Sequence, residues 1–473
     1  NVVGEGVVIP GLAVINNTST KTVSISESNK RINSLFATAE LGYKGFLYLN
    51  ATGRNDWFST LNPNNNSYLY PSVSGSFVFS ELFHMPEFID FGKFRVGYAS
   101  VGGDTDPYQL DLTYELLGFN YNGYPLGNIS QPTVPNRLLR PLSVSEFEVG
   151  FDVRFFKNRL GIDMAFYDKL TKNDITQETL TATSGYNGAS VNVGKLRNRG
   201  AELLIYGTPV QTSAFSWDIS LNGSYNKSKV LKISNQASEL NLGSRGKASV
   251  RLIEGEEYAQ IVGPAIERNE QGQDIISNDG LNIVNRGNVV SFGSGIHKWN
   301  MGITNTINYK SFALSFLVDG KFGAKLYSVS SYELDHRGMT VKSLLGRADG
   351  AILPGVKQSD GKPNDIMVTP SMAGNRLIVI NRREALNDYL YNASFIKLRS
   401  IALTYNFSKG VLNSVRFIKG ASISLVGNNL ALLMTHAKQI DPDGNWSTGN
   451  AQGIEASNLP PIKSYGVDIK LKF

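Results

Sequence analysis

The composition of the 473-residue chain argues against several classes of protein. Charged residues make up 18%, below the share of about 25% that is typical of soluble domains, whereas aromatic residues reach 10%. The formal net charge is only +6, with no cationic stripe, so we expect no nucleic-acid partner. The absence of cysteine excludes disulfides, thiolate nucleophiles and cysteine-bound zinc.

The first thirty residues carry no clear pattern of their own. The chain opens at Asn1 without the features of a signal peptide, and no apolar run approaches the ~18 residues of a transmembrane helix. We expect residues 1–30 to form a loop or the end of a preceding strand, and residues 31–473 to form the strands described next.

Apolar and polar residues alternate with period two along most of the remaining chain. In Ser145–Phe155, Phe147 and Phe151 fall on one face and Glu148 and Asp152 on the other. Such runs reach about ten residues, the length that crosses a bilayer when tilted, whereas ordinary strands average nearer five or six. The alternation predicts thirteen strands, at 31–41, 46–53, 72–80, 93–101, 145–155, 160–169, 199–208, 215–226, 298–309, 312–328, 396–407, 415–428 and 464–473.

The connections between these strands alternate between short and long. Shorter connections fall at 42–45, 81–92, 156–159, 209–214, 310–311 and 408–414, and longer ones at 54–71, 102–144, 170–198, 227–297, 329–395 and 429–463. Bacterial outer-membrane barrels have short periplasmic turns and long extracellular loops. The pattern therefore predicts an all-β, antiparallel transmembrane β-barrel, surrounded by outer-membrane lipid, with a periplasmic C-terminus. Because closed single-chain bacterial barrels have an even number of strands, we expect at least one strand upstream of these thirteen.

No pattern of residues indicates catalysis or a bound metal. The histidines lie far apart, and neither a nucleophile elbow nor a phosphate-binding loop occurs. Asp441, Asp443 and Asn445 begin like a calcium loop, but Trp446 stands where glycine is needed and Gln452 where glutamate is needed. The carboxylates of the long hairpin alternate along strands, which is typical of a polar lumen rather than of a glycosidase pair. We therefore expect no enzyme activity, no cofactor and no metal.

Polar and aromatic residues in the loops are candidates for ligand binding. Sugars are held by aromatic faces and by hydrogen bonds from aspartate, asparagine and arginine. An equally simple interpretation is that these residues cap strands or fasten loops to one another. The candidates are Arg54, Asn55, Asp56 and Trp57, then Tyr121 and Tyr124 with Phe119 beside them, and finally Asp441, Asn445 and Trp446.

Several motifs, in the same order along the chain, resemble the SusC/RagA-like TonB-dependent transporters. They are ATGRNDW at 51–57, YPSVS at 70–74, FRVGYASVG at 94–102, the hairpin at 146–167, NRGAEL at 198–203, FIKLR at 395–399, GNNL at 427–430, Asp441-Pro442 and the terminal Phe473. The resemblance implies a Gram-negative outer-membrane barrel of about 22 strands, filled by an N-terminal plug. This chain would supply 13–14 of them, as the C-terminal portion of the barrel, without the plug.

The resemblance also implies partners and a function. It implies TonB-dependent import of oligosaccharides, or of peptides in some members, with a SusD-like surface lipoprotein as a lid. TonB would act through the part of the protein that these residues lack. Three other interpretations stay open from the residues alone: a passive porin, a barrel enzyme using His336 or His436, and a soluble binding sandwich.

Overall fold

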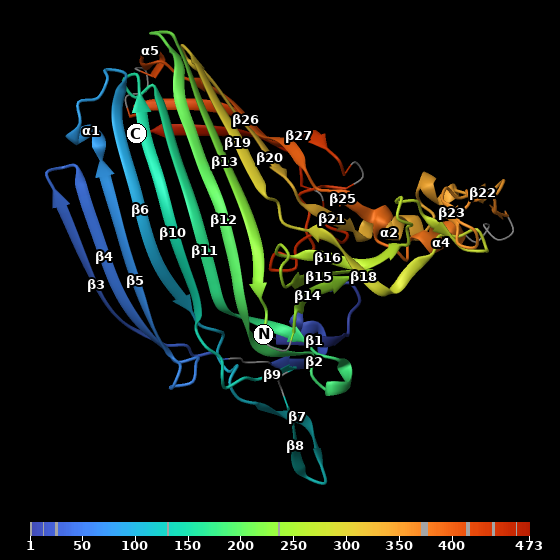
Figure 1. The fold of residues 1–473 in the computed structure, drawn as a ribbon. Coiled ribbons are helices and arrows are strands. Elements are labelled where there is room, and N and C mark those ends of the chain that lie inside the picture. The colour runs from blue at the N-terminus through green and yellow to red at the C-terminus, as the bar shows by residue number, and fades with distance from the viewer. Residues whose placement is uncertain are drawn as a thin grey trace.

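The structure, a computed structural model, describes residues 2–12, 14–23, 27–129, 132–234, 237–369, 377–412, 417–437, 440–459 and 461–473. These residues form one large curved antiparallel sheet, here called the wall, with smaller sheets and helices gathered at one of its ends (Figure 1).

The wall is a continuous path of thirteen strands, each paired antiparallel with its neighbour. Among the described residues, the two outermost strands, β3 and β29, each pair on one side only, and the short β9 (Thr133–Val134) joins β12 in parallel. The wall strands are β3 (Ile32–Tyr43), β4 (Leu47–Phe58), β5 (Ser67–Val78), β6 (Ile89–Gly103), β10 (Leu142–Phe155), β11 (Leu160–Thr179), β12 (Gly188–Gln211), β13 (Phe215–Lys232), β19 (Trp299–Tyr309), β20 (Phe312–Phe322), β26 (Phe395–Asn406), β27 (Gly420–Thr435) and β29 (Ser464–Lys472).

Each of the thirteen predicted strands is present, but several boundaries differ. β4 continues to Phe58, five residues beyond its predicted end at 53. β11 and β12 reach 20 and 24 residues, because their cross-strand hydrogen bonds continue where the apolar alternation has stopped. The predicted strand 312–328 is divided at Gly323, whose φ of +89° turns β21 (Lys325–Ser328) away from the wall. β27 begins at Gly420 rather than at 415, and residues 413–416 lie outside the described ones.

The register places the alternating residues on two distinct faces. Phe151 stands between Phe94 and Met164 on the apolar face, and Gly150 stands between Arg95 and Ala165 on the polar face. On the polar face, Arg95 reaches Asp163 at 2.8 Å and Glu148 at 3.4 Å. Gly150 provides the room for this guanidinium, since a Cβ there would lie 2.4 Å from Arg95 Nε. We call the apolar face outward and the polar face inner, as expected of a barrel in lipid.

The short connections gather at one end of the wall, together with the last strand's C-terminal end (Figure 1). They use left-handed residues for tight reversal, including Gly45 and Asn158. Two short helices, α1 (Phe79–Leu82) and α5 (Lys409–Leu412), occupy the larger turns.

Two hairpins stand apart from the wall. One is made by β1 (Val2–Val7) and β2 (Thr18–Val23), joined through η1 (Ile15–Asn17), in the region expected to be a loop or the end of a strand. The other, made by β7 (Tyr114–Tyr121) and β8 (Tyr124–Ile129), projects beyond the opposite end of the wall from the short turns (Figure 1).

Three long connections, 233–298, 323–394 and 436–463, fold together into what we call the loop module. Its largest sheet orders β14 (Glu239–Arg245), β15 (Ala248–Ile253), β16 (Gln260–Ile266) and β18 (Val284–Ser294). Smaller sheets pair β21 with β25 (Leu390–Asn392) and β28 (Ile454–Glu455), β17 (Ile275–Ile276) with β23 (Val356–Lys357), and β22 (Ala351–Ile352) with β24 (Met367–Val368). Helices α2 (Val329–His336), α4 (Leu377–Arg382), η3 (Val341–Leu344) and η4 (Asn387–Tyr389) complete it, whereas η2 (Ala182–Ser184) belongs to the tip of the β11–β12 hairpin.

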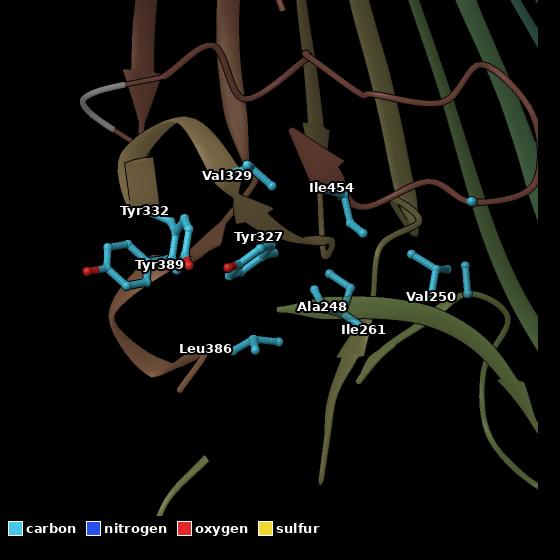
Figure 2. Packing of buried hydrophobic residues seen from close by; sticks show 11 residues of the cluster. Ala248, Val250, Ile261, Tyr327, Val329, Tyr332, Leu386, Tyr389 and Ile454 are labelled. Carbon is cyan, nitrogen blue, oxygen red and sulfur yellow. The ribbon is translucent and has the colours of Figure 1, made fainter. Parts of the chain in front are cut away.

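The loop module has a buried apolar core to which all three connections contribute. Ile261 comes from the first connection, Tyr327 and Leu386 from the second and Ile454 from the third. Each of these side chains is fully buried, at 0% exposed. Figure 2 shows these side chains converging between the β15–β16 strands and the α2 region. The hydrophobic effect stabilises a core of this kind, so the loop module has a source of stability that does not depend on lipid.

Candidate ligand-binding surface

The inner face of the wall carries a hollow of about 760 Å³. Its lining mixes polar and apolar side chains, and the charges are mixed in sign. Lining residues from six strands of the wall include Arg95, Asp163, Glu202, Asn222, Asn300 and Asp319. A surface of this kind offers hydrogen bonds in many directions without a dominant charge, which suits a neutral or zwitterionic polar ligand.

An ion network ties the last long loop to the inner face. The ammonium group of Lys397, on β26, lies 2.8 Å from Asp441 and 3.7 Å from Asp443, and Lys397 is only 5% exposed. Lys321, on β20, reaches Asp443 at 2.9 Å. Arg399 bridges Asp319 and Asp443, the latter at 3.2 Å. Since a buried ammonium needs paired carboxylates, this network holds residues 441–443 against the wall.

The network also sets the protonation of Asp443. Burial works to raise the pKa of this carboxyl, but the hydrogen bond from Lys321 and the charges of Lys397 and Arg399 outweigh it. The pKa of Asp443 is therefore below its ordinary value, and the carboxylate stays charged at neutral pH. Asp441 and Asp443 thus act as counter-ions within the fold.

Two of the predicted ligand residues in this loop have clear structural partners, and the third is partly open. Asp441 pairs with Lys397, and the side-chain oxygen of Asn445 accepts the Gly453 amide at 2.7 Å. Trp446 remains 41% exposed, with its ring beside Gly243 of the loop module. Of the three, Trp446 has the surface that a ligand could stack on.

The predicted cluster at 54–57 lies within β4 rather than in a loop, and the strand's pleat divides it. Arg54 and Asp56 are on the inner face, opposite Tyr70 and Tyr68 of β5, and form an ion pair at 2.8 Å. Asn55 and Trp57 are on the outward face, where Asn55 donates to Ser67 Oγ at 3.0 Å. The four residues therefore do not form one site, because neighbours along a strand point to opposite sides.

The third predicted group lies on the projecting hairpin. Tyr121 and Tyr124 face each other across its turn and are 68% and 75% exposed. Phe119 belongs to β7, and its side chain lies outside the described residues. Wall strands line the inner hollow, whereas the β7–β8 hairpin that carries the two tyrosines projects beyond the wall (Figure 1), so the tyrosines present a separate surface.

Sequence reasoning missed the residues that anchor the loops to the wall. Lys397 and Arg399 were noted only as part of the FIKLR motif. Their spacing of two residues on one strand places both cations on the same face, and this could have indicated a role in anchoring the loops. In addition, no group of three or more potential metal ligands occurs within the described ranges. Nor is any helix in that part of the chain long and apolar enough to cross a membrane.

Comparison with known proteins agrees with this architecture. A family model described as "TonB dependent receptor-like, beta-barrel" matches residues 9–336. TonB-dependent receptor P26 of Formosa agariphila is 25% identical over 97% of this chain and 48% of its own length. TonB-dependent receptor SusC of Bacteroides thetaiotaomicron is 23% identical over 80% of this chain and 37% of its own length.

A solved structure described as the RagAB peptide transporter shares the fold. Its TM-score is 0.77 at 20% identity, covering 98% of this chain and 50% of the other. The chain thus spans about half the length of the relatives that it matches. The resemblance based on the sequence motifs is confirmed, and the chain belongs to the TonB-dependent receptor β-barrel family, of the SusC/RagA type, in the outer membrane of Gram-negative bacteria.

Proposed function

We propose that this chain forms the wall and the outer loops of a TonB-dependent importer that takes up oligosaccharides. The mixed-charge, hydrogen-bonding hollow on the inner face is the observation that carries the proposal. Sugar hydroxyls need many donors and acceptors and little net charge, and Trp446 adds an aromatic face at the outer loops. Transport of this kind needs no covalent chemistry and no cofactor.

The proposal includes an orientation and further parts of the barrel. The loop module is outside the cell, and the short turns and the C-terminus are in the periplasm. The unpaired edges of β3 and β29 are satisfied by further strands, to about 22 in all, because open backbone edges in lipid cost several kcal/mol per group. A plug fills the lumen and couples to TonB, and a SusD-like lipoprotein covers the loop module and the β7–β8 hairpin.

An oligopeptide is the second candidate ligand. The hollow contains the guanidinium of Arg95 as well as the carboxylate of Glu202, and such a pair of charges would suit the two termini of a peptide. The RagAB relative is described as a peptide transporter. A passive porin is the third possibility, and it would conduct ions without TonB.

The experiment is ligand binding by the complete transporter, purified from outer membranes with its plug and any lipoprotein. Calorimetry with defined oligosaccharide and oligopeptide pools compares Trp446→Ala with Trp299→Ala. The two tryptophans are matched, at 41% and 43% exposed, but Trp299 is on the outward face of β19. Loss of one stacking face predicts roughly tenfold weaker sugar binding for Trp446→Ala, and no change for Trp299→Ala.

The outcomes separate the candidates. Binding of the peptide pool alone would replace the oligosaccharide by a peptide. Steady ion conduction in planar bilayers, with neither pool bound, would favour the porin and contradict the proposal.

A further inference from the structure

The outward face of the wall changes character abruptly between β11 and β13. Along β12 this face runs through Ile205, Leu203 and Ala201, and then continues with Arg199 and Arg197. Along β13 it runs through Leu221 and Tyr225 and then continues with lysines. Because these positions are two apart on regular strands, they share one face. We call the apolar residues of this outward face the apolar belt, and the belt ends at the cations.

The cations at this boundary stand opposite one another. Arg199 is opposite Lys227 and Arg197 is opposite Lys229, and we call these four residues the cation ladder. Like charges directly opposite on neighbouring strands are destabilising. The ladder lies at the end of the wall away from the short turns, since the turn after Gln211 joins β12 and β13 at the short-turn end.

One carboxylate partly neutralises the ladder. Asp168 of β11 stands opposite Arg199, accepts its Nε–H at 3.0 Å and accepts the Nε–H of Arg197 at 2.8 Å. Both lysines are exposed, and within the described ranges neither has an ion pair. Four cations against one carboxylate leave a net charge of +3 on a small patch of three strands.

A hollow and a pair of aromatic rings lie next to this charge on the outward face. The hollow, about 320 Å³, is lined by Asp168 and Arg197 together with apolar side chains, including Tyr98, Phe147 and Leu231. Beside it, Tyr225 and Trp299 pack with their ring centroids 4.5 Å apart. Aromatic side chains of this kind mark the level of the lipid headgroups. A ligand seated here would meet both cations and apolar surface.

We propose that the cation ladder binds a phosphorylated lipid of the outer leaflet. The phosphate accepts hydrogen bonds from the ladder and relieves the repulsion between its opposed cations, and the acyl chains lie along the apolar belt beneath. The assignment to the outer leaflet rests on the orientation given under the proposed function. The anion is taken to be a lipid headgroup rather than a free phosphate, because the site combines the charge with adjoining apolar side chains and an aromatic pair.

The test measures lipid binding to the complete transporter by native mass spectrometry in a zwitterionic detergent. Dioleoyl phosphatidic acid is the anionic probe and dioleoyl phosphatidylcholine the neutral one. The double variant Lys227→Gln with Lys229→Gln removes the two unpaired cations. The control is Lys44→Gln with Lys310→Gln, which removes two exposed lysines beside Tyr43 and Tyr309 at the short-turn end.

The ladder variant is expected to bind phosphatidic acid about 30-fold more weakly, since each cation near an anionic headgroup contributes about fivefold. The control variant should bind it as the unchanged protein does, and phosphatidylcholine binding should be weak throughout. Equal loss in both variants, or equal binding of the two lipids, would overturn the proposal. So would displacement by inorganic phosphate alone, which would indicate a simple anion site.

The same proteins also undergo the oligosaccharide assay. Retained sugar binding together with lost lipid binding confirms the site independently of the transport proposal. Retained phosphatidic acid binding in the ladder variant contradicts the site, whatever the sugar result.

Discussion

The wall and the loop module are built from one chain but obtain their stability in different ways. In the wall, strands expose Phe147, Phe151 and Val467 on one face. In the loop module, Ile261, Tyr327 and Leu386 are fully buried. The wall is a surface that lipid must complete, whereas the module is a small water-excluding domain, and each follows the solvent that it faces.

The comparison predicts that damage to the junction between the two regions has the largest effect. Lys397→Met removes the buried ammonium and leaves Asp441 without its partner. Breaking a buried ion pair on one side costs about 4 kcal/mol. We expect amide hydrogen exchange over residues 440–455 to accelerate strongly, while β10 and β11 keep their protection.

The matched control for this change is Arg337→Met. Arg337 pairs with Glu333 on the surface of α2 at 3.7 Å, with both side chains largely exposed. Such pairs contribute at most about 0.5 kcal/mol. Equal acceleration in both variants would show that the junction does not depend on buried charge.

A slightly smaller loss of stability is expected when a side chain in the core of the loop module is shortened. Leu386→Ala should cost about 3 kcal/mol, because Leu386 is 0% exposed and its methyl groups fill the space over Gly263. The same change at Leu403, which is 45% exposed on the outward face, should cost far less, since lipid refills the space. The difference in stability is measured by thermal unfolding of the loop module, with proteolysis of the loops as the readout. An equal loss of stability in both variants would contradict the distinction between the two regions.

Acid should loosen the loop module. Asp388 is held at 2.8 Å by both Arg382 nitrogens and at 2.9 Å by Lys342. Burial works to raise the pKa of Asp388, but these cations outweigh it and place the pKa below the ordinary 3.8. The pair's stabilisation is therefore complete above the ordinary pKa and is lost as pH falls through the lowered one.

Hydrogen exchange of residues 377–392, measured between pH 6 and pH 2 and corrected for intrinsic rates, tests this direction. Asp388→Asn should flatten part of the pH dependence, with Asp443 accounting for some of the remainder because its pKa is lowered in the same direction. A module that loosens toward higher pH would contradict the assignment.

The smallest effect on stability is expected at the projecting hairpin. Tyr124→Ala should change stability by less than about 0.5 kcal/mol, because the side chain is 75% exposed. A role in binding the lid protein would instead appear as weaker co-purification of the lipoprotein from outer membranes. Destabilisation without any loss of the partner would mean that the hairpin packs against the barrel itself.

The sequence predicts the wall well and the loop module poorly, for a physical reason. Period-two alternation is a local signal, and the partner of each wall strand is its neighbour in the chain, so Phe147 and Glu148 suffice to assign two faces. The core of the module joins Ile261, Tyr327 and Ile454, which are far apart in sequence and carry no shared period. Contacts of that kind are decided by tertiary packing.

The candidate site was predicted only in part for the same reason. The cluster at Arg54–Trp57 was interpreted as a loop because the alternation weakens after Gly53, yet pairing with β3 and β5 extends the strand and separates the side chains. Asp441 was recognised as notable, but its partner Lys397 lies 44 residues away and only the fold brings them together. Whether Trp446 or the tyrosines of the hairpin contact a ligand stays a prediction.

In the proposed orientation, the loop module is outside the cell and the short turns are in the periplasm. Because these 473 residues contain no cysteine, an introduced cysteine is the only one among them, and the unsubstituted complete transporter measures any background labelling. Asp360→Cys in the loop module and Lys157→Cys in a short turn, each in the complete transporter, are treated in intact cells with a maleimide polymer too large for porins. We predict labelling at position 360 in intact cells, and at 157 only after the outer membrane is opened. Labelling of 157 alone in intact cells would invert the orientation and contradict the account.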